Sequence, residues 1–87
     1  MRIIAEPLTA SEQVTLQPCY LVGACAGYEN RSLYLYNEGA STATAALKVL
    51  TLSVDATSIP LPGIYCPNGI YAVLDHGDAV VYYYLAE

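Results

Sequence analysis

The chain has 87 residues, enough for one small domain. Of these, 55% are hydrophobic and only 13% are charged, which excludes an intrinsically disordered protein. The formal net charge is −5, and the only basic residues are Arg2, Arg31 and Lys48, which are far apart in the sequence. Because phosphate binding needs clustered Lys and Arg, we expect no contact with nucleic acid or with an anionic membrane.

The first residues do not resemble an export signal. Arg2 is followed by three apolar residues before Glu6 and Pro7 interrupt the run, so the apolar core of a signal peptide is missing. The uncharged stretch 13–28 contains a proline and two glycines and is shorter than the ~20 apolar residues of a membrane-spanning helix. We therefore expect a soluble protein that is made in the cytoplasm.

The three cysteines are Cys19, Cys25 and Cys66. An odd number without an export signal favours buried free thiols in a reducing compartment, and one bridge from Cys19 or Cys25 to Cys66 stays open. Cys19 and Cys25 are six positions apart on one predicted strand, so we expect them on the same face but about 20 Å apart. Zinc ligands must converge, and we predict no metal or other cofactor.

Short runs of strand-forming residues, separated by Gly, Pro and Asn, dominate the first half of the chain. Val14–Leu16 predicts one strand. Cys19–Cys25 predicts a second strand, in which Gly23 marks a bulge or a close approach of another backbone. Ser32–Tyr36 predicts a third strand whose leucines and tyrosines alternate between two faces, and residues 37–39 predict the turn after it.

Residues 40–54 fit two structures. Alanine and leucine would allow two or three helical turns, but Ser and Thr crowd the segment and no amphipathic stripe is present. We predict a loop and then a strand over 46–54, with a helix as the alternative. Thr57–Pro62 is predicted to be extended, because proline disfavours helical geometry in the residue before it, and its two prolines suit an edge or a linker.

The C-terminal third contains the clearest turn. Asn68-Gly69, between the predicted strands 63–66 and 70–74, is a strong hairpin signal. Residues 75–78 predict the next turn and Ala79–Leu85 the last strand. Its two faces carry Val80, Tyr82 and Tyr84 on one side and Ala79, Val81, Tyr83 and Leu85 on the other. Since both faces are apolar or aromatic, we expect the sheet core to cover one and a partner subunit the other.

Together these elements predict an all-β fold, a small antiparallel β-sandwich or barrel of seven to eight short strands. Residues 1–87 form a single domain in this interpretation, with 1–10 as an N-terminal arm. All nine aromatic residues are tyrosines, which suit half-buried sheet faces and interfaces.

No arrangement of residues predicts catalysis. His76, the only histidine, lies in a turn beside Asp75 and Asp78. A histidine beside an aspartate can act as a base, but Asp and Gly are also ordinary turn residues. The two aspartates lack the DxDxDG spacing of a calcium loop, and no Walker, GxGxxG, GxSxG or HExxH motif is present. We predict that the protein is not an enzyme.

Three segments together resemble a known class of protein. They are the opening IIAEPLTAS over 3–11, the pattern G-I-Y-x-x-N-G-I-Y-A-V-L over 63–74, and A-V-V-Y-Y-Y over 79–84. These segments resemble small β-sandwich virion proteins of tailed bacteriophages. The resemblance implies a structural protein on the exterior of a virion, which decorates or cements the capsid or belongs to the tail or a fibre.

From composition and resemblance we expect a homo-oligomer that docks on the major capsid protein or another virion protein. A small domain with few charges must expose apolar area, and such patches usually mark contacts. The expected contact residues lie in the last strand, the proline-rich edge and the N-terminal arm: Tyr82, Tyr83, Tyr84, Leu85, Pro60, Leu61, Pro62, Ile3, Ile4 and Leu8. The alternative is a fibre- or tail-associated module that binds a receptor or a carbohydrate, with the pair Tyr34 and Tyr36 or the pair Tyr82 and Tyr84 stacked on a sugar ring.

Overall fold

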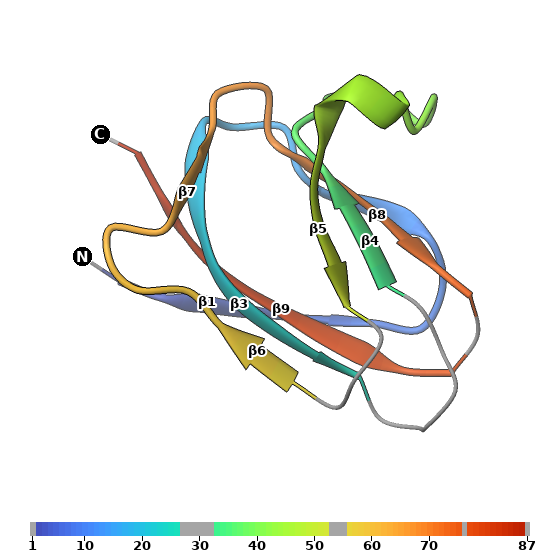
Figure 1. Cartoon of the computed structure of the whole chain (residues 1–87), viewed down its shortest axis with the longest axis horizontal. Coiled ribbons are helices and arrows are strands. Elements are labelled where there is room, and N and C mark those ends of the chain that lie inside the picture. The colour runs from blue at the N-terminus through green and yellow to red at the C-terminus, as the bar shows by residue number, and fades with distance from the viewer. Residues whose placement is uncertain (1, 27–32, 53–55, 76, 87) are drawn as a thin grey trace.

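The computed structural model describes residues 2–26, 33–52, 56–75 and 77–86, and within these ranges the protein is all-β (Figure 1). The elements are β1 Ile4–Leu8, β2 Glu12–Thr15, β3 Cys19–Ala26, β4 Leu33–Tyr36, the 3-10 helix η1 Ala45–Leu47, β5 Lys48–Leu52, β6 Ala56–Ser58, β7 Ile64–Cys66, β8 Ile70–Leu74 and β9 Ala79–Leu85. The predicted fold class is confirmed, although the described residues form nine strands where seven or eight were predicted.

The strands form two antiparallel sheets that lie as separate layers (Figure 1). The first sheet has five strands in the order β1-β9-β3-β6, and β7 pairs with β3 on the same edge as β6. The second sheet has four strands in the order β2-β8-β4-β5. β9 therefore lies inside the five-stranded sheet, with β1 on one side and β3 on the other.

One hydrophobic core fills the space between the two sheets. β3 and β9 contribute Leu21 and Val81, and β4 contributes Leu33 and Leu35, none of which has exposed surface. Between the two leucines, Tyr34 faces away from the core, as the predicted alternation requires. Burying each of these aliphatic side chains stabilises the fold by about 1.5–3 kcal/mol, so the leucine positions fix which face of β4 points inward.

The predicted turn at Asn68-Gly69 is present, but the hairpin is not. The Gly69 N–H donates to the Cys66 carbonyl (3.2 Å). However, β7 pairs with β3 while β8 pairs with β2 and β4, so the turn joins strands of different sheets. Contacts with other segments redirect the chain, because the Asn68 N–H donates to Asn37 Oδ1 (2.9 Å) and a Cβ on Gly69 would meet the Thr15 carbonyl of β2.

β3 contains a bulge between Leu21 and Gly23, where its pairing register with β9 shifts by one residue. Val22 is the inserted residue. Gly23 also faces a close neighbour, because a Cβ at this position would lie 2.9 Å from the Thr57 carbonyl of β6. Both roles predicted for Gly23 are confirmed.

The bulge reverses the alternation of side chains along β3, so the prediction that Cys19 and Cys25 share a face is wrong. Cys19 lies in the core with no exposed surface. Cys25 lies on the outer face, with its Sγ 3.8 Å from the hydroxyl of Tyr82. The period of two fails here because one strand residue has no opposite partner.

The ambiguous segment after β4 forms a strand. β5 covers Lys48–Leu52, and the last residues of the predicted strand lie outside the described ranges. The helical alternative is limited to the single turn η1, which has no buried residue. A helix here would have had no apolar stripe to bury, whereas β5 places Leu52 in the core.

Glu38 fastens the loop that leads into η1. Glu38 is 5% exposed, and its carboxylate accepts hydrogen bonds from the Thr44 N–H, at 3.0 Å to Oε1 and 3.4 Å to Oε2. Hydrogen bonding from Thr44 is the main reason that the pKa of the Glu38 carboxyl is lowered, while burial opposes the shift. The ionised form is thus the form that the folded loop prefers.

A depressed pKa predicts how stability depends on acid. Because the folded carboxyl has the lower pKa, its contribution is complete above the unfolded pKa and is lost as pH falls through the folded value. Glu38→Gln should therefore lower the melting temperature at pH 7, and the gap to the unsubstituted protein should close as the pH falls through the folded pKa of the carboxyl. Thermal melts of both proteins across this range measure the gap, and a gap independent of pH would contradict the role of the charge.

Both segments expected at the margins of the domain are edge strands of the five-stranded sheet. β1, within the segment expected as an N-terminal arm, pairs with β9 from Ile4 opposite Tyr83 to Leu8 opposite Ala79. β6, which overlaps the start of the predicted segment 57–62, lies at the other edge, one of the two places that the prolines suited. A turn follows it, in which the Gly63 N–H donates to the Pro60 carbonyl (2.9 Å).

Candidate interaction surface

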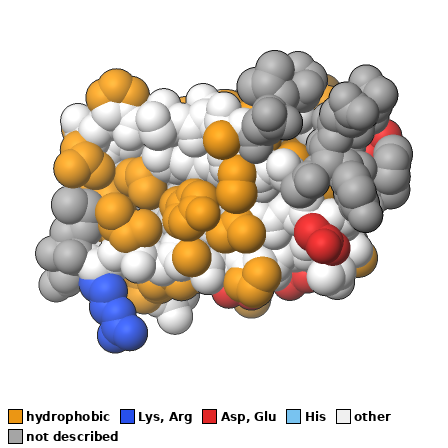
Figure 2. Space-filling model, turned by 90° about the horizontal axis from the view of Figure 1, so that it is seen from below, with side chains coloured by type: hydrophobic (Ala, Val, Ile, Leu, Met, Phe, Trp, Pro, Cys, Tyr) orange, Lys and Arg blue, Asp and Glu red, His pale blue; other side chains and the backbone are white. Residues whose placement is uncertain are grey.

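The outer face of the five-stranded sheet is apolar. Figure 2 views this side and shows hydrophobic side chains gathered over its middle. The bulge and the alternation of β3 and β9 place Val22, Tyr82 and Tyr84 there. We call this surface the tyrosine face, and its members are Ile3, Tyr20, Val22, Cys25, Leu61, Tyr65, Val80, Tyr82 and Tyr84.

Three tyrosines from three strands stack at one end of the tyrosine face. Tyr20 on β3 is opposite Tyr65 on β7 and Tyr84 on β9. Its ring centroid lies 5.0 Å from each neighbour, at interplanar angles of 35° to Tyr65 and 15° to Tyr84. The Tyr84 hydroxyl donates to the Pro62 carbonyl (2.7 Å). Each aromatic pair adds about 0.5–1.5 kcal/mol, so the stack ties the proline turn and three strands together.

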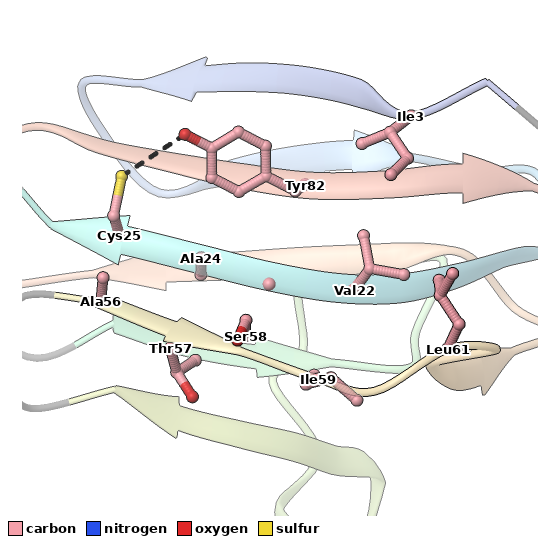
Figure 3. Close-up of a pocket in the computed structure, with 11 residues that line it drawn as sticks. Ile3, Val22, Ala24, Cys25, Ala56, Thr57, Ser58, Ile59, Leu61 and Tyr82 are labelled. Atoms are coloured by element: carbon pink, nitrogen blue, oxygen red, sulfur yellow. Dashed lines mark hydrogen bonds between the residues drawn. The ribbon is translucent and has the colours of Figure 1, made fainter.

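A groove of about 430 Å³ lies on the same face (Figure 3). Gly23, which has no side chain, leaves space at the bottom of the groove, and the residues that line it include Ile3, Val22 and Leu61. At one end the Cys25 thiol and the Tyr82 hydroxyl form the hydrogen bond that Figure 3 marks, and this bond raises the pKa of Tyr82. The groove thus offers apolar contact with one weakly polar end.

The members of the tyrosine face include no charged residue, although the whole chain carries a net charge of −5. Two of them are prominent, since Ile3 is 51% exposed and Leu61 is 58% exposed. In Figure 2 the basic side chains in view lie at the lower left and the acidic ones at the lower edge and on the right, away from the apolar centre. This face can therefore be dehydrated by a partner without removing a charge from water.

The ten predicted contact residues do not share one environment. Exposed or outward-facing positions are held by Ile3, Pro60, Leu61, Pro62, Tyr82, Tyr84 and Leu85. Tyr83 and Leu8 are core residues, 6% and 1% exposed, and Ile4 packs against the core. The alternation of β9 explains Tyr83, and the pairing of β1 with β9 explains Leu8. Tyr83 and Leu8 are accordingly left out of the contact set below.

Five members of the tyrosine face were absent from the predicted contact residues: Tyr20, Val22, Cys25, Tyr65 and Val80. The two tyrosines carried a usable signal, because each stands within a predicted strand. Their proximity could not be read from the chain, since residues 20, 65 and 84 meet only through strand pairing. Cys25 was hidden by the bulge, which reverses the faces of the side chains that follow Val22.

Other chemistry has little support among the described residues. His76 lies outside the described ranges, and Asp75 and Asp78, on either side of it, are exposed. Within those ranges, no group of three or more His, Cys, Asp or Glu side chains is placed to hold a metal ion. A hydrogen bond with Cys66 and, secondly, burial raise the pKa of the Cys19 thiol, which keeps this thiol protonated.

The described part of the chain forms no helix long and apolar enough to cross a membrane. No family model, curated protein or solved structure matches the chain.

Proposed function

We propose that this protein is a structural module that pairs with a second copy through its tyrosine face and docks on a larger assembly, as a decoration or cement protein of a phage capsid. The observation that carries the pairing is the uncharged, apolar tyrosine face with its stacked rings and groove. A contiguous apolar patch of this kind on a small acidic domain is typical of an interface.

The edges of the five-stranded sheet are poor alternatives for pairing. Pro7 stands in β1 and provides no N–H for a further strand. On the other edge, β6 and β7 have three residues each, and a turn with Pro60 and Pro62 separates them. Short strands and prolines prevent another strand from adding along an edge. For the five-stranded sheet, a partner can therefore bury apolar surface only by covering the tyrosine face.

Charge favours a second copy as the occupant. Two copies that each carry −5 repel one another, and the repulsion is weakest where the approaching surfaces hold no charge. The tyrosine face meets this condition, and tyrosine is among the residues enriched at interface cores. The same acidity is unfavourable near packaged nucleic acid and suits the outside of a particle.

The capsid is the partner implied by the resemblance to phage virion proteins. Many weak contacts can hold such a protein on a particle, because a second linked site binds at high effective concentration. A dimer with two docking sites would gain from this effect. Saturable binding to capsids that lack the protein would support the proposal, and absence of binding to such capsids would contradict the capsid role.

The self-association step has its own test. Tyr82→Ser combined with Tyr84→Ser should weaken dimerisation at least about tenfold, because large aromatic residues at interface centres each contribute more than about 1 kcal/mol. Light scattering after size exclusion, over a dilution series, gives the dissociation constant. The matched control is Tyr34→Ser with Tyr71→Ser, which makes the same change on the outer face of the other sheet.

The two double variants together decide the role of the tyrosine face. Weakened dimerisation by the first pair alone supports the proposal. Equal weakening by both pairs, or a loss of melting temperature without any change in mass, rules out the tyrosine face as the interface.

A receptor- or carbohydrate-binding module remains the second candidate, and Tyr65 favours it. Its ring is 51% exposed at the edge of the stack, where a sugar could lie against it. Tyr20 is less suitable, because Tyr65 and Tyr84 lie against its ring on both sides. Binding to a glycan array that free sugar quenches and that Tyr65→Ser removes would favour this candidate.

A further inference from the structure

Two of the three cysteines are directly opposite one another. Cys19 on β3 pairs with Cys66 on β7, although 47 positions separate them in sequence. Both side chains face the core and have no exposed surface. The Cys19 Sγ lies 4.0 Å from the Cys66 carbonyl oxygen, and the Cys66 Sγ lies 3.6 Å from the Ile64 carbonyl oxygen. The two thiols are therefore neighbours within the same layer.

The backbone at this pair already fits a disulfide. Opposed residues in antiparallel strands have Cα atoms about 4.5 or 5.5 Å apart, and disulfides span Cα separations of about 4.4–6.8 Å. Directly opposed side chains also point to the same face. A bond between the two sulfur atoms would need rotation of the side chains and no change of strand register.

We propose that Cys19 and Cys66 are a latent disulfide that closes when the folded protein meets a low-molecular-weight disulfide such as oxidised glutathione. One thiolate attacks a sulfur of glutathione disulfide and releases one glutathione as its thiolate. The second cysteine then attacks the mixed disulfide, its proton leaves to solvent, and the second glutathione departs. The two cysteines lose two electrons and two protons, and glutathione disulfide becomes two molecules of glutathione.

Cys66 is the cysteine suited to the first attack. The hydrogen bond from the Cys19 thiol lowers the pKa of Cys66, whereas the same bond and burial raise the pKa of Cys19. Thiolates, not thiols, attack disulfides. Cys66 also stands on a strand of three residues that pairs with β3 alone among the described strands. Brief opening of this short strand would expose Cys66 without disrupting the rest of the sheet.

Cys25 does not belong to the pair. It lies on the opposite face of β3, beyond the bulge, and its Sγ is hydrogen-bonded with Tyr82. It is also the more accessible thiol, because it is partly exposed while the other two are buried. Cys25→Ser therefore removes the competing thiol and leaves Cys19 and Cys66 in place.

The test uses the full chain with Cys25→Ser in a buffer of reduced and oxidised glutathione. We expect complete loss of both free thiols, a mass lower by two hydrogen atoms, and no retained glutathione. Because the bond restricts the unfolded chain over a loop of this length, the melting temperature should rise by about 10 °C or more. The matched control, Cys25→Ser with Cys66→Ser, should show no such rise in the same buffer.

A second measurement tests the disulfide when burial does not keep glutathione away from the two thiols. The Cys25→Ser protein is unfolded in urea and refolded in the same glutathione buffer, so that the thiols meet the oxidant before burial. If both thiols are still free after refolding, or if the bond forms and the melting temperature falls, the native geometry does not accommodate the disulfide and the proposal is wrong. The outcome is independent of capsid binding and of dimerisation.

Discussion

Gly69→Ala is expected to destabilise the protein by about 2–6 kcal/mol, because a left-handed residue becomes strained and a tight contact is forced open. Gly69 has φ +93°, and a Cβ there would overlap the Thr15 carbonyl oxygen and lie 3.0 Å from the Leu16 Cα. Both atoms belong to backbone, which cannot rotate away. A domain of this size has about 4–13 kcal/mol of stability in total, so much of the protein could unfold. Urea denaturation followed by circular dichroism measures the loss.

Gly39→Ala is the matched control for this turn. Its added Cβ would lie 3.1 Å from the Asn68 carbonyl and 3.5 Å from the Leu16 Cδ2, so it meets the same region of the molecule without a positive φ. We expect a change within about 1 kcal/mol. Similar losses for the two variants would mean that contact with the turn, and not the left-handed geometry of Gly69, sets the cost.

Tyr83→Ala is expected to cost about 3–5 kcal/mol, as for other large buried aromatic side chains. Tyr83 is 6% exposed within the core, and it lies between Ile4 of β1 and Leu21 of β3 in the sheet. Burial is also the main reason that its pKa is raised. Removing the ring leaves a cavity that Leu21 and its neighbours cannot fill. Chemical denaturation at a concentration where the protein is monomeric measures the effect.

Tyr82→Ala tests the opposite face of the same strand. Tyr82 follows the alternation outward and contacts the groove and Cys25, so its removal should cost no more than about 1.5 kcal/mol in the monomer. Equal losses at positions 82 and 83 would contradict the assignment of inner and outer faces in β9.

The fold class could be predicted because its signals are local. Leucine and tyrosine alternate in β4, and Gly or Pro stands near most strand ends. The alternation of side chains and the positions of Gly and Pro therefore predict the strands, with small errors in their bounds. Sheet partners depend on distant residues. Asn68-Gly69 is a strong hairpin signal, yet the two strands that it joins belong to different sheets, because contacts with Thr15 and Asn37 direct the chain across.

The candidate surface was half predictable for a related reason. β9 is apolar on both faces, so its sequence predicts that both faces are covered but does not indicate which tyrosine points outward. Tyr83 was therefore grouped with its neighbours. In β3 a single inserted residue, Val22, reversed the faces of every later side chain and hid Cys25. Composition could not provide either assignment, because both depend on hydrogen-bond register.

The place of β9 inside the five-stranded sheet has a consequence for folding order. β1 and β3 are made early, but each pairs along its length with residues 79–85, which follow the other described strands in the sequence. Most contacts in this sheet thus close long loops, and folding dominated by such non-local pairing is slow, in the range of milliseconds to seconds. Until β9 is made, β1 and the edge of β3 that pairs with β9 expose their hydrogen-bonding groups to other chains. During synthesis this protein depends on its last strand to prevent aggregation.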